Sequence, residues 1–99
     1  MNKQKQIDRI GNLLNDKSLK TIINVKARFK NDRIIETIKK ENVVDAFEIE
    51  LLYSALHRKK GFCSLEIYVH ACRNNCWMTE RAVLETDEDF FYFFYNVEN

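Results

Sequence analysis

Hydrophobic and polar residues alternate in two stretches of the chain, residues 21–30 and residues 62–72. Alternation places the apolar side chains on one face of an extended strand, because successive side chains point to opposite faces. Both stretches are therefore predicted to be half-buried β-strands. The predicted inward-facing residues are Ile23, Val25, Ala27 and Phe29 in the first stretch and Cys63, Leu65, Ile67, Val69 and Ala71 in the second.

Two further segments carry apolar residues at helical spacing. Near the amino terminus this spacing predicts an amphipathic helix over residues 3–15. Gly11 weakens that helix, because glycine has a low helix propensity. Asp32 can cap a second, shorter helix that closes on Lys39 and Lys40. The apolar residues are Ile7, Ile10, Leu13 and Leu14 in the first helix and Ile34, Ile35 and Ile38 in the second.

Residues 43–60 fit either a helix or a strand. Asn42 before the segment and Gly61 after it would frame a helix, but the apolar residues of such a helix leave no clean polar face. On a strand, the apolar residues that alternate from Phe47 to Ala55 all face one side. The pattern therefore favours a strand, and the helix stays as the alternative.

This strand is predicted to form a hairpin with the strand that follows, because that register brings two apolar faces together. The hairpin sets Glu50 opposite Tyr68 and Glu48 opposite His70. The helix alternative gives the order helix-strand-helix-helix and then a hairpin, which is similar in outline to winged-helix DNA-binding domains. Asp45, Glu48 and Glu50 would then lie on the helix that faces phosphates, and their charge has the wrong sign for that role.

Six consecutive aromatic residues, 90–95, follow an acidic triplet at residues 87–89. Thr86 and the acids form a strong helix start, with a capping side chain and negative charge at the positive end of the helix dipole. Helical spacing also sorts the rings by polarity, whereas a strand would put one tyrosine on each face. We therefore predict a helix that packs Phe90, Phe93, Phe94 and Val97 inward, turns Tyr92 and Tyr95 outward and leaves Phe91 at the boundary.

The remaining segment links these elements into one domain. Asn74 and Asn75 supply a turn into a further strand over residues 76–85, since asparagine tolerates the positive φ of tight hairpin turns. The predicted order is α-β-α-β-β-β-α. We predict a single α+β domain over residues 1–99, in two layers, with a four-stranded mixed or antiparallel sheet and helices on one face.

Composition supports a small globular domain and adds little about function. At 45% hydrophobic and 31% charged residues, the 99-residue chain can bury one core without metal or disulfide support. The amino terminus lacks the apolar region of a signal peptide, and no apolar run has the length of a membrane span, so we expect a cytoplasmic protein. The odd number of cysteines, three, favours reduced thiols in such a compartment.

Charge is unevenly distributed although the net charge is only +1. Residues 1–41 carry eleven Lys or Arg against five Asp or Glu, and residues 42–99 carry five against ten. The last fifteen residues hold five acids and no base. This carboxyl-terminal segment would suit a partner with a basic surface. Mutual neutralisation of the two halves within the fold is the alternative explanation.

No set of residues predicts catalysis or metal binding. His70, Cys72 and Cys76 have the composition of a zinc site, but a structural site needs four ligands and the fourth is missing. Cysteine–histidine catalysis would also need an orienting group and an oxyanion pocket, and the pattern supplies neither. We therefore expect free thiols, no cofactor, no bound metal and no enzymatic activity.

The aromatic, acidic carboxyl-terminal helix is the leading candidate for a binding surface. Tyrosine rings present apolar area together with a hydroxyl group, a combination enriched at protein interfaces. We predict a protein-binding domain that acts as an inhibitor or adaptor, of the kind that phages and mobile elements encode, with a second copy of the chain as the alternative partner. The predicted partner-binding residues are Asp87, Glu88, Asp89, Phe91, Tyr92 and Tyr95.

A nucleic-acid-binding regulator is the competing hypothesis. Basic residues two positions apart on the outward face of the first strand could follow a phosphate backbone. That face lacks the interleaved aromatic residues that single-strand binders use. The residues that would make these contacts are Lys26, Arg28, Lys30, Arg33, Lys39 and Lys40.

Overall fold

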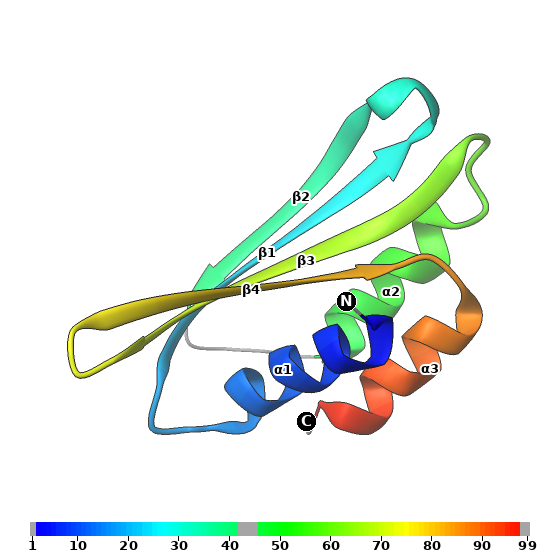
Figure 1. Ribbon diagram of the computed structural model, residues 1–99. Helices are drawn as coiled ribbons and strands as arrows, with labels where there is room; N and C mark the ends of the chain where they lie inside the picture. The colour runs from blue at the N-terminus through cyan, green and yellow to red at the C-terminus, as the bar shows by residue number, and fades with distance from the viewer. Residues whose placement is uncertain (1, 42–45, 98–99) are drawn as a thin grey trace.

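Helices and antiparallel strands follow one another in the order α1-β1-β2-α2-β3-β4-α3 (Figure 1). The computed structural model describes residues 2–41 and 46–97, and at residues 32, 35–41 and 46 it describes the backbone alone. The elements are α1 (Lys3–Asn15), β1 (Lys20–Phe29), β2 (Ile34–Glu41), α2 (Ala46–Leu56), β3 (Phe62–Arg73), β4 (Cys76–Leu84) and α3 (Asp87–Asn96), with a short 3-10 turn at Lys30–Asp32.

The strands form one antiparallel sheet with the order β2-β1-β3-β4. The three helices of the described residues lie against the same face of this sheet (Figure 1). A single apolar core fills the space between them, because every second residue of β1 and β3 points toward the helices. The α+β class predicted from the sequence is confirmed.

Helix α1 packs closely against α3, and Gly11 makes this approach possible. A Cβ atom at Gly11 would lie 2.9 Å from the backbone oxygen of Asn96, which is closer than atoms normally come. The side-chain amide of Asn15 donates a hydrogen bond to the same oxygen at 2.6 Å. The glycine that weakens the isolated helix is therefore explained by the packing of its neighbour.

Five of the predicted elements are found. Helix α1 coincides with the predicted helix, strands β1, β3 and β4 with three of the four predicted strands, and α3 with the predicted aromatic helix. Asn74 and Asn75 both have positive φ in the β3–β4 turn, as expected. Cys63 is the one predicted inward residue of β1 and β3 that is exposed, because the β1–β3 register shifts there and pairs Phe29 with Phe62 but Arg28 with Ser64.

The helix predicted after Asp32 is wrong, since this segment forms β2. Asn31 has a φ of 66°, which turns the chain back, and the Phe29 amide donates to the Arg33 carbonyl at 2.7 Å. Residues 34–41 then pair with β1 in antiparallel register, with Val25 opposite Ile38. The β-branched residues of the segment favour a strand, and an available sheet edge decides the outcome.

The strand predicted between Phe47 and Ala55 is also wrong, because Ala46–Leu56 is helix α2. The helix alternative is right for residues 46–56, whereas residues 43–45 lie outside the described part. Strand β1 occupies the position beside β3 that the predicted hairpin needed. Consequently the predicted pairs are wrong: Tyr68 lies opposite Asn24 and Arg81, and His70 lies opposite Ile22 and Thr79.

Candidate protein-binding face

Helix α3 begins with a complete capping box. The Thr86 side chain accepts a hydrogen bond from the Asp89 amide at 3.2 Å, and the Asp89 carboxylate accepts from the Thr86 amide at 3.0 Å. The same carboxylate accepts from the Glu85 amide and lies 3.1 Å from the Lys3 ammonium. Burial acts to raise the pKa of Asp89, but these backbone bonds and Lys3 outweigh it and lower the pKa. Asp89 is therefore committed to internal contacts.

The inward face of α3 supplies a large share of the core. Phe90, Phe93 and Val97 are buried, and Phe94 packs partly buried against the same cluster. Residues three and four positions apart lie on one side of a helix, so the predicted sorting of these side chains is confirmed. The position of the core ring Phe93 fixes which side chains of α3 face outward.

Tyr92 is half-buried and bonded to another helix. Its hydroxyl donates a hydrogen bond to the Asp8 carboxylate of α1 at 2.7 Å. This bond, with a smaller contribution from burial, raises the pKa of Tyr92. The tyrosine predicted to contact a partner thus helps to hold α3 against α1.

Phe91 and Tyr95 remain on the surface. The exposed fractions of Phe91 and Tyr95 are 65% and 90%. They lie four positions apart, so they form a stripe on the outer side of α3. Asp87 and Glu88 are exposed at the amino-terminal end of this stripe. Four of the six residues predicted to contact a partner are therefore exposed together on one side of α3.

Helix α2 lies beside this stripe and is linked to α3 through Tyr53. The Tyr53 ring stacks on Phe90, and its hydroxyl donates a hydrogen bond to the Asp87 carboxylate. Burial, followed by the bond to Asp87 and the negative charge around it, raises the pKa of Tyr53 to about 12. This contact fixes the position of α2 relative to the acidic start of α3.

A groove of about 200 Å³ runs between the two helices. On α2, Phe47 and Leu51 are 56% and 55% exposed and lie on the same side as Glu50 and Ser54 of the groove wall. The sequence did not single out Phe47 and Leu51, although the lack of a polar face on this helix was a signal. We call the surface formed by Phe47, Glu50, Leu51, Asp87, Glu88, Phe91 and Tyr95 the α2–α3 face.

The residues predicted to bind nucleic acid are divided among three parts of the sheet. Lys26 and Arg28 lie on the outer face of the sheet, opposite the helices, and Lys30 and Arg33 lie at the end of the sheet where β1 turns into β2. Lys39 and Lys40 are consecutive residues of β2 in register with Asn24 and Ile23 of β1. The structure thus separates Lys30 and Arg33, at one end of the predicted basic surface, from Lys39 and Lys40, toward its other end.

On the outer face of the sheet the charged groups contact one another. Glu66 is only 2% exposed there, with its carboxylate bonded by the guanidinium groups of Arg28 and Arg81. Burial acts to raise the pKa of Glu66, but the hydrogen bonds from Arg81 and Arg28 outweigh it and lower the pKa. The Tyr68 ring lies between two cations, 5.2 Å from Lys26 and 5.7 Å from Arg81.

The cysteines and histidines are dispersed. Cys63, Cys72 and Cys76 are free thiols, and the His70 ring nitrogen Nδ1 bonds the Thr79 hydroxyl at 2.9 Å. Among the side chains that the structure describes, no three of His, Cys, Asp or Glu are grouped as metal ligands would be.

Comparisons with protein families, with curated proteins and with solved structures find no match to this chain. None of the helices in the described residues has the length and apolar character needed to cross a bilayer.

Proposed function

We propose that the protein acts by binding another protein through the α2–α3 face, as a non-enzymatic inhibitor or adaptor. The observation that supports this proposal is the exposure of four large side chains, Phe47, Leu51, Phe91 and Tyr95, on two neighbouring helices. Exposed apolar side chains that are grouped rather than scattered are typical of interaction sites. Aromatic residues also contribute a large share of the binding free energy at protein interfaces.

The charge around these side chains favours a basic partner. Glu50 and Asp87 line the groove, Glu88 follows Asp87 in the first turn of α3, and all three are exposed carboxylates. Opposite charge at the rim of an interface accelerates association and selects among partners. A second copy of the chain that presented the same face would bring like charges together. We therefore favour a different protein, with basic residues around an apolar surface, over self-association.

Affinity capture from the cells that make the protein tests this proposal. The informative variant is the double substitution Phe91→Ser with Tyr95→Ser, because both side chains are exposed and neither belongs to the core. We expect the native chain to retain a protein that the double variant loses. The matched control is Trp77→Ser, since Trp77 is a similarly exposed ring, 57%, on the sheet.

Two outcomes would contradict the proposal. Equal capture by the native chain and by the Phe91→Ser, Tyr95→Ser variant would show that the α2–α3 face is not used. Loss of capture by Trp77→Ser alone would move the contact to the sheet. If light scattering showed self-association of the native chain but not of the double variant, the partner would be a second copy of the chain rather than a basic protein.

Nucleic-acid binding is the second candidate function, and one observation favours it. Tyr68 supplies the aromatic ring that the outward face of β1 lacks, and it lies near Lys26 and Arg81 on the outer face of the sheet. None of the described helices covers that face (Figure 1). A mobility-shift assay at two salt concentrations tests this function, which predicts binding that weakens steeply with salt and with Arg81→Gln. No shift at low salt would exclude it.

A further inference from the structure

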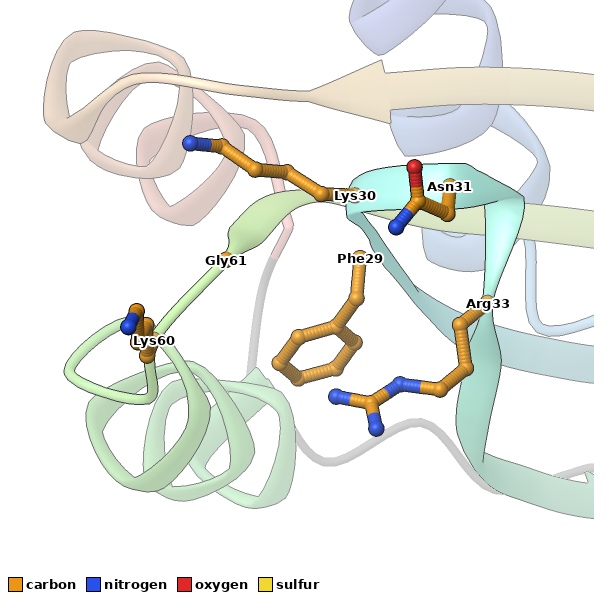
Figure 2. Close-up of a pocket in the computed structure, with 6 residues that line it drawn as sticks. All are labelled: Phe29, Lys30, Asn31, Arg33, Lys60 and Gly61. Atoms are coloured by element: carbon orange, nitrogen blue, oxygen red, sulfur yellow. The ribbon is translucent and has the colours of Figure 1, made fainter.

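A pocket of about 310 Å³ opens at the end of the sheet, where three segments meet. The end of β1 and the 3-10 turn after it supply one wall, Arg33, just before β2, supplies another, and the chain that leads from α2 into β3 supplies the third (Figure 2). The residues that line the pocket are Phe29, Lys30, Asn31, Arg33, Lys60 and Gly61.

The backbone of the pocket is held by specific contacts. The Lys30 amide donates a hydrogen bond to the Gly61 carbonyl at 2.9 Å, which joins the β1–β2 turn to the start of β3. Asn31 and Gly61 both have positive φ, 66° and 86°, so each wall turns sharply at the pocket. Residues far apart in the sequence are thereby fixed side by side.

The Arg33 guanidinium is also positioned in advance. Its central carbon lies 5.3 Å from the centre of the Phe29 ring, a cation–π contact. Figure 2 shows the Arg33 side chain extending past the ring toward the side from which Lys60 comes. Because Phe29 is itself buried, the ring provides a rigid support for the guanidinium rather than a surface on which a base could stack.

Three cationic residues, Lys30, Arg33 and Lys60, therefore line one concave site, and none of the lining side chains that the structure describes is acidic. Among the side chains that the structure describes, none of the three forms an ion pair. Elsewhere Arg28 and Arg81 are both paired with the buried Glu66. Like charges held together without a counter-charge create a strong local positive potential.

We propose that this pocket binds a phosphate group, in the form of a phosphomonoester dianion. The planar guanidinium of Arg33 can donate two parallel hydrogen bonds to phosphate oxygens, and the two lysines add charge. The Asn31 side-chain amide, on the same rim, provides a further donor. This inference is independent of protein binding, because the pocket and the α2–α3 face share no residue.

The phosphate can come from two sources that share this chemistry, a free nucleoside monophosphate or the 5′ end of a nucleic-acid strand. The pocket recognises the charged group in both, since the lining offers no exposed ring for a base. Lys26 and Arg28 precede the pocket on β1 but lie on the outer face of the sheet, so only a strand that continues from the pocket onto that face could contact them. A free nucleotide would not reach them.

A titration with inorganic phosphate at constant ionic strength, followed by the backbone amide NMR spectrum of the intact chain, tests the proposal. We expect saturable shifts at the amides of Lys30, Asn31 and Gly61. The double variant Arg33→Gln, Lys60→Gln should weaken binding at least about tenfold, because it removes two of the charged donors. The matched control, Lys17→Gln with Lys59→Gln, removes the same charge from exposed positions outside the pocket and should bind as the native chain does.

Three further arms identify the source of the phosphate. A nucleoside monophosphate, a 5′-phosphorylated oligonucleotide and the same oligonucleotide without its phosphate are titrated in turn. Tighter binding of the phosphorylated strand than of the nucleotide supports a nucleic-acid end, and equal binding supports a free nucleotide. Shifts that do not saturate, that are equal in the pocket variant and its control, or that are equal with and without the 5′ phosphate would overturn the proposal.

Discussion

Aromatic and charged side chains are arranged differently on the outer face of the sheet and on the α2–α3 face. On the outer face of the sheet, Tyr68 lies between two cations, and the carboxylate of Glu66 is buried under two guanidinium groups. On the α2–α3 face, Phe91 and Tyr95 project from the surface with exposed carboxylates beside them. The charged side chains around Tyr68 and Glu66 on the sheet face thus contact one another or the Tyr68 ring, whereas Phe91 and Tyr95 on the helical face present apolar area to solvent.

This difference indicates which surface contributes to stability and which is available for binding. A buried carboxylate with two cationic donors is costly to disturb, because removing one partner leaves the other desolvated charge without compensation. An exposed phenylalanine can be removed with little effect on folding, since it is already in contact with water. Substitutions on the two faces should therefore have opposite consequences for stability and for binding.

The largest expected effect is the difference in stability between a substitution on the buried side of α3 and one on its exposed side. Phe93→Ala should lower the free energy of unfolding by about 3–5 kcal/mol, because it leaves a cavity in the core. Phe91→Ala, two positions away and 65% exposed, should change it by no more than about 0.5 kcal/mol. Urea denaturation of both variants measures the two values. Similar losses in the two variants would show that Phe91 belongs to the core and that the α2–α3 face is not free for a partner.

A smaller loss in the free energy of unfolding is expected from Glu66→Gln on the sheet face. This substitution keeps the shape of the side chain but removes the charge that Arg28 and Arg81 share. We expect a loss of about 1–2 kcal/mol, less than for a fully buried pair, because both guanidinium groups are partly exposed to solvent. Urea denaturation at neutral pH measures this loss.

The pH dependence of the stability of the same variant tests whether the charge of Glu66 causes this loss. The folded-state pKa of Glu66 is lowered, so the ionised carboxylate favours folding. Its contribution is fully present above the ordinary pKa of a glutamate, about 4.3, and is lost as the pH falls through the folded-state pKa. Glu66→Gln should therefore flatten the fall in stability at acid pH. An unchanged acid dependence would mean that the arginines do not stabilise the charged form.

The smallest expected effect is spectroscopic and concerns the contact between α2 and α3. The pKa of Tyr53 is raised to about 12, so its contribution to stability is complete below the unfolded-state value, about 10, and is lost as the pH rises through 12. Absorbance of tyrosinate, followed to high pH, should show a late phase that disappears in Tyr53→Phe. Asp87→Asn should shift this phase to lower pH, and no shift would show that the bond to Asp87 is not formed.

Much of the fold could be predicted because several segments carry consistent local signals. In α3 the Thr86 cap, the acidic first turn and the spacing of the rings all indicate the same helix. In β1 the strict alternation of apolar and polar residues determines which face of the strand is buried. These elements need no information from distant parts of the chain, and the structure confirms them.

The two errors arise where local patterns are ambiguous and distant contacts decide. The three isoleucines of residues 34–38 fit a helix or a strand, and the free edge of β1 selects the strand. In α2 the alternation of apolar residues favoured a strand only if every apolar residue was assumed to be buried. Phe47 and Leu51 are instead exposed, and this is why they are candidates for binding.

The candidate sites depend on tertiary structure in the same way. The sequence indicated Phe91 and Tyr95, but it could not place α2 beside them. It likewise could not show that Asp89 and Tyr92 would be used within the fold, in the capping box and in the bond to Asp8. Nor could it bring Lys60 to Lys30 and Arg33, which lie some thirty positions earlier in the chain.

Hydroxyl-radical footprinting of the captured complex tests the central claim most directly, because it compares the two faces within one sample. Phe91 and Tyr95 report on the α2–α3 face, and Trp77, which is 57% exposed, reports on the sheet as an internal reference. We predict that binding lowers the oxidation of Phe91 and Tyr95 severalfold and leaves that of Trp77 unchanged. Protection of Trp77 with undiminished oxidation of Phe91 and Tyr95 would contradict the account.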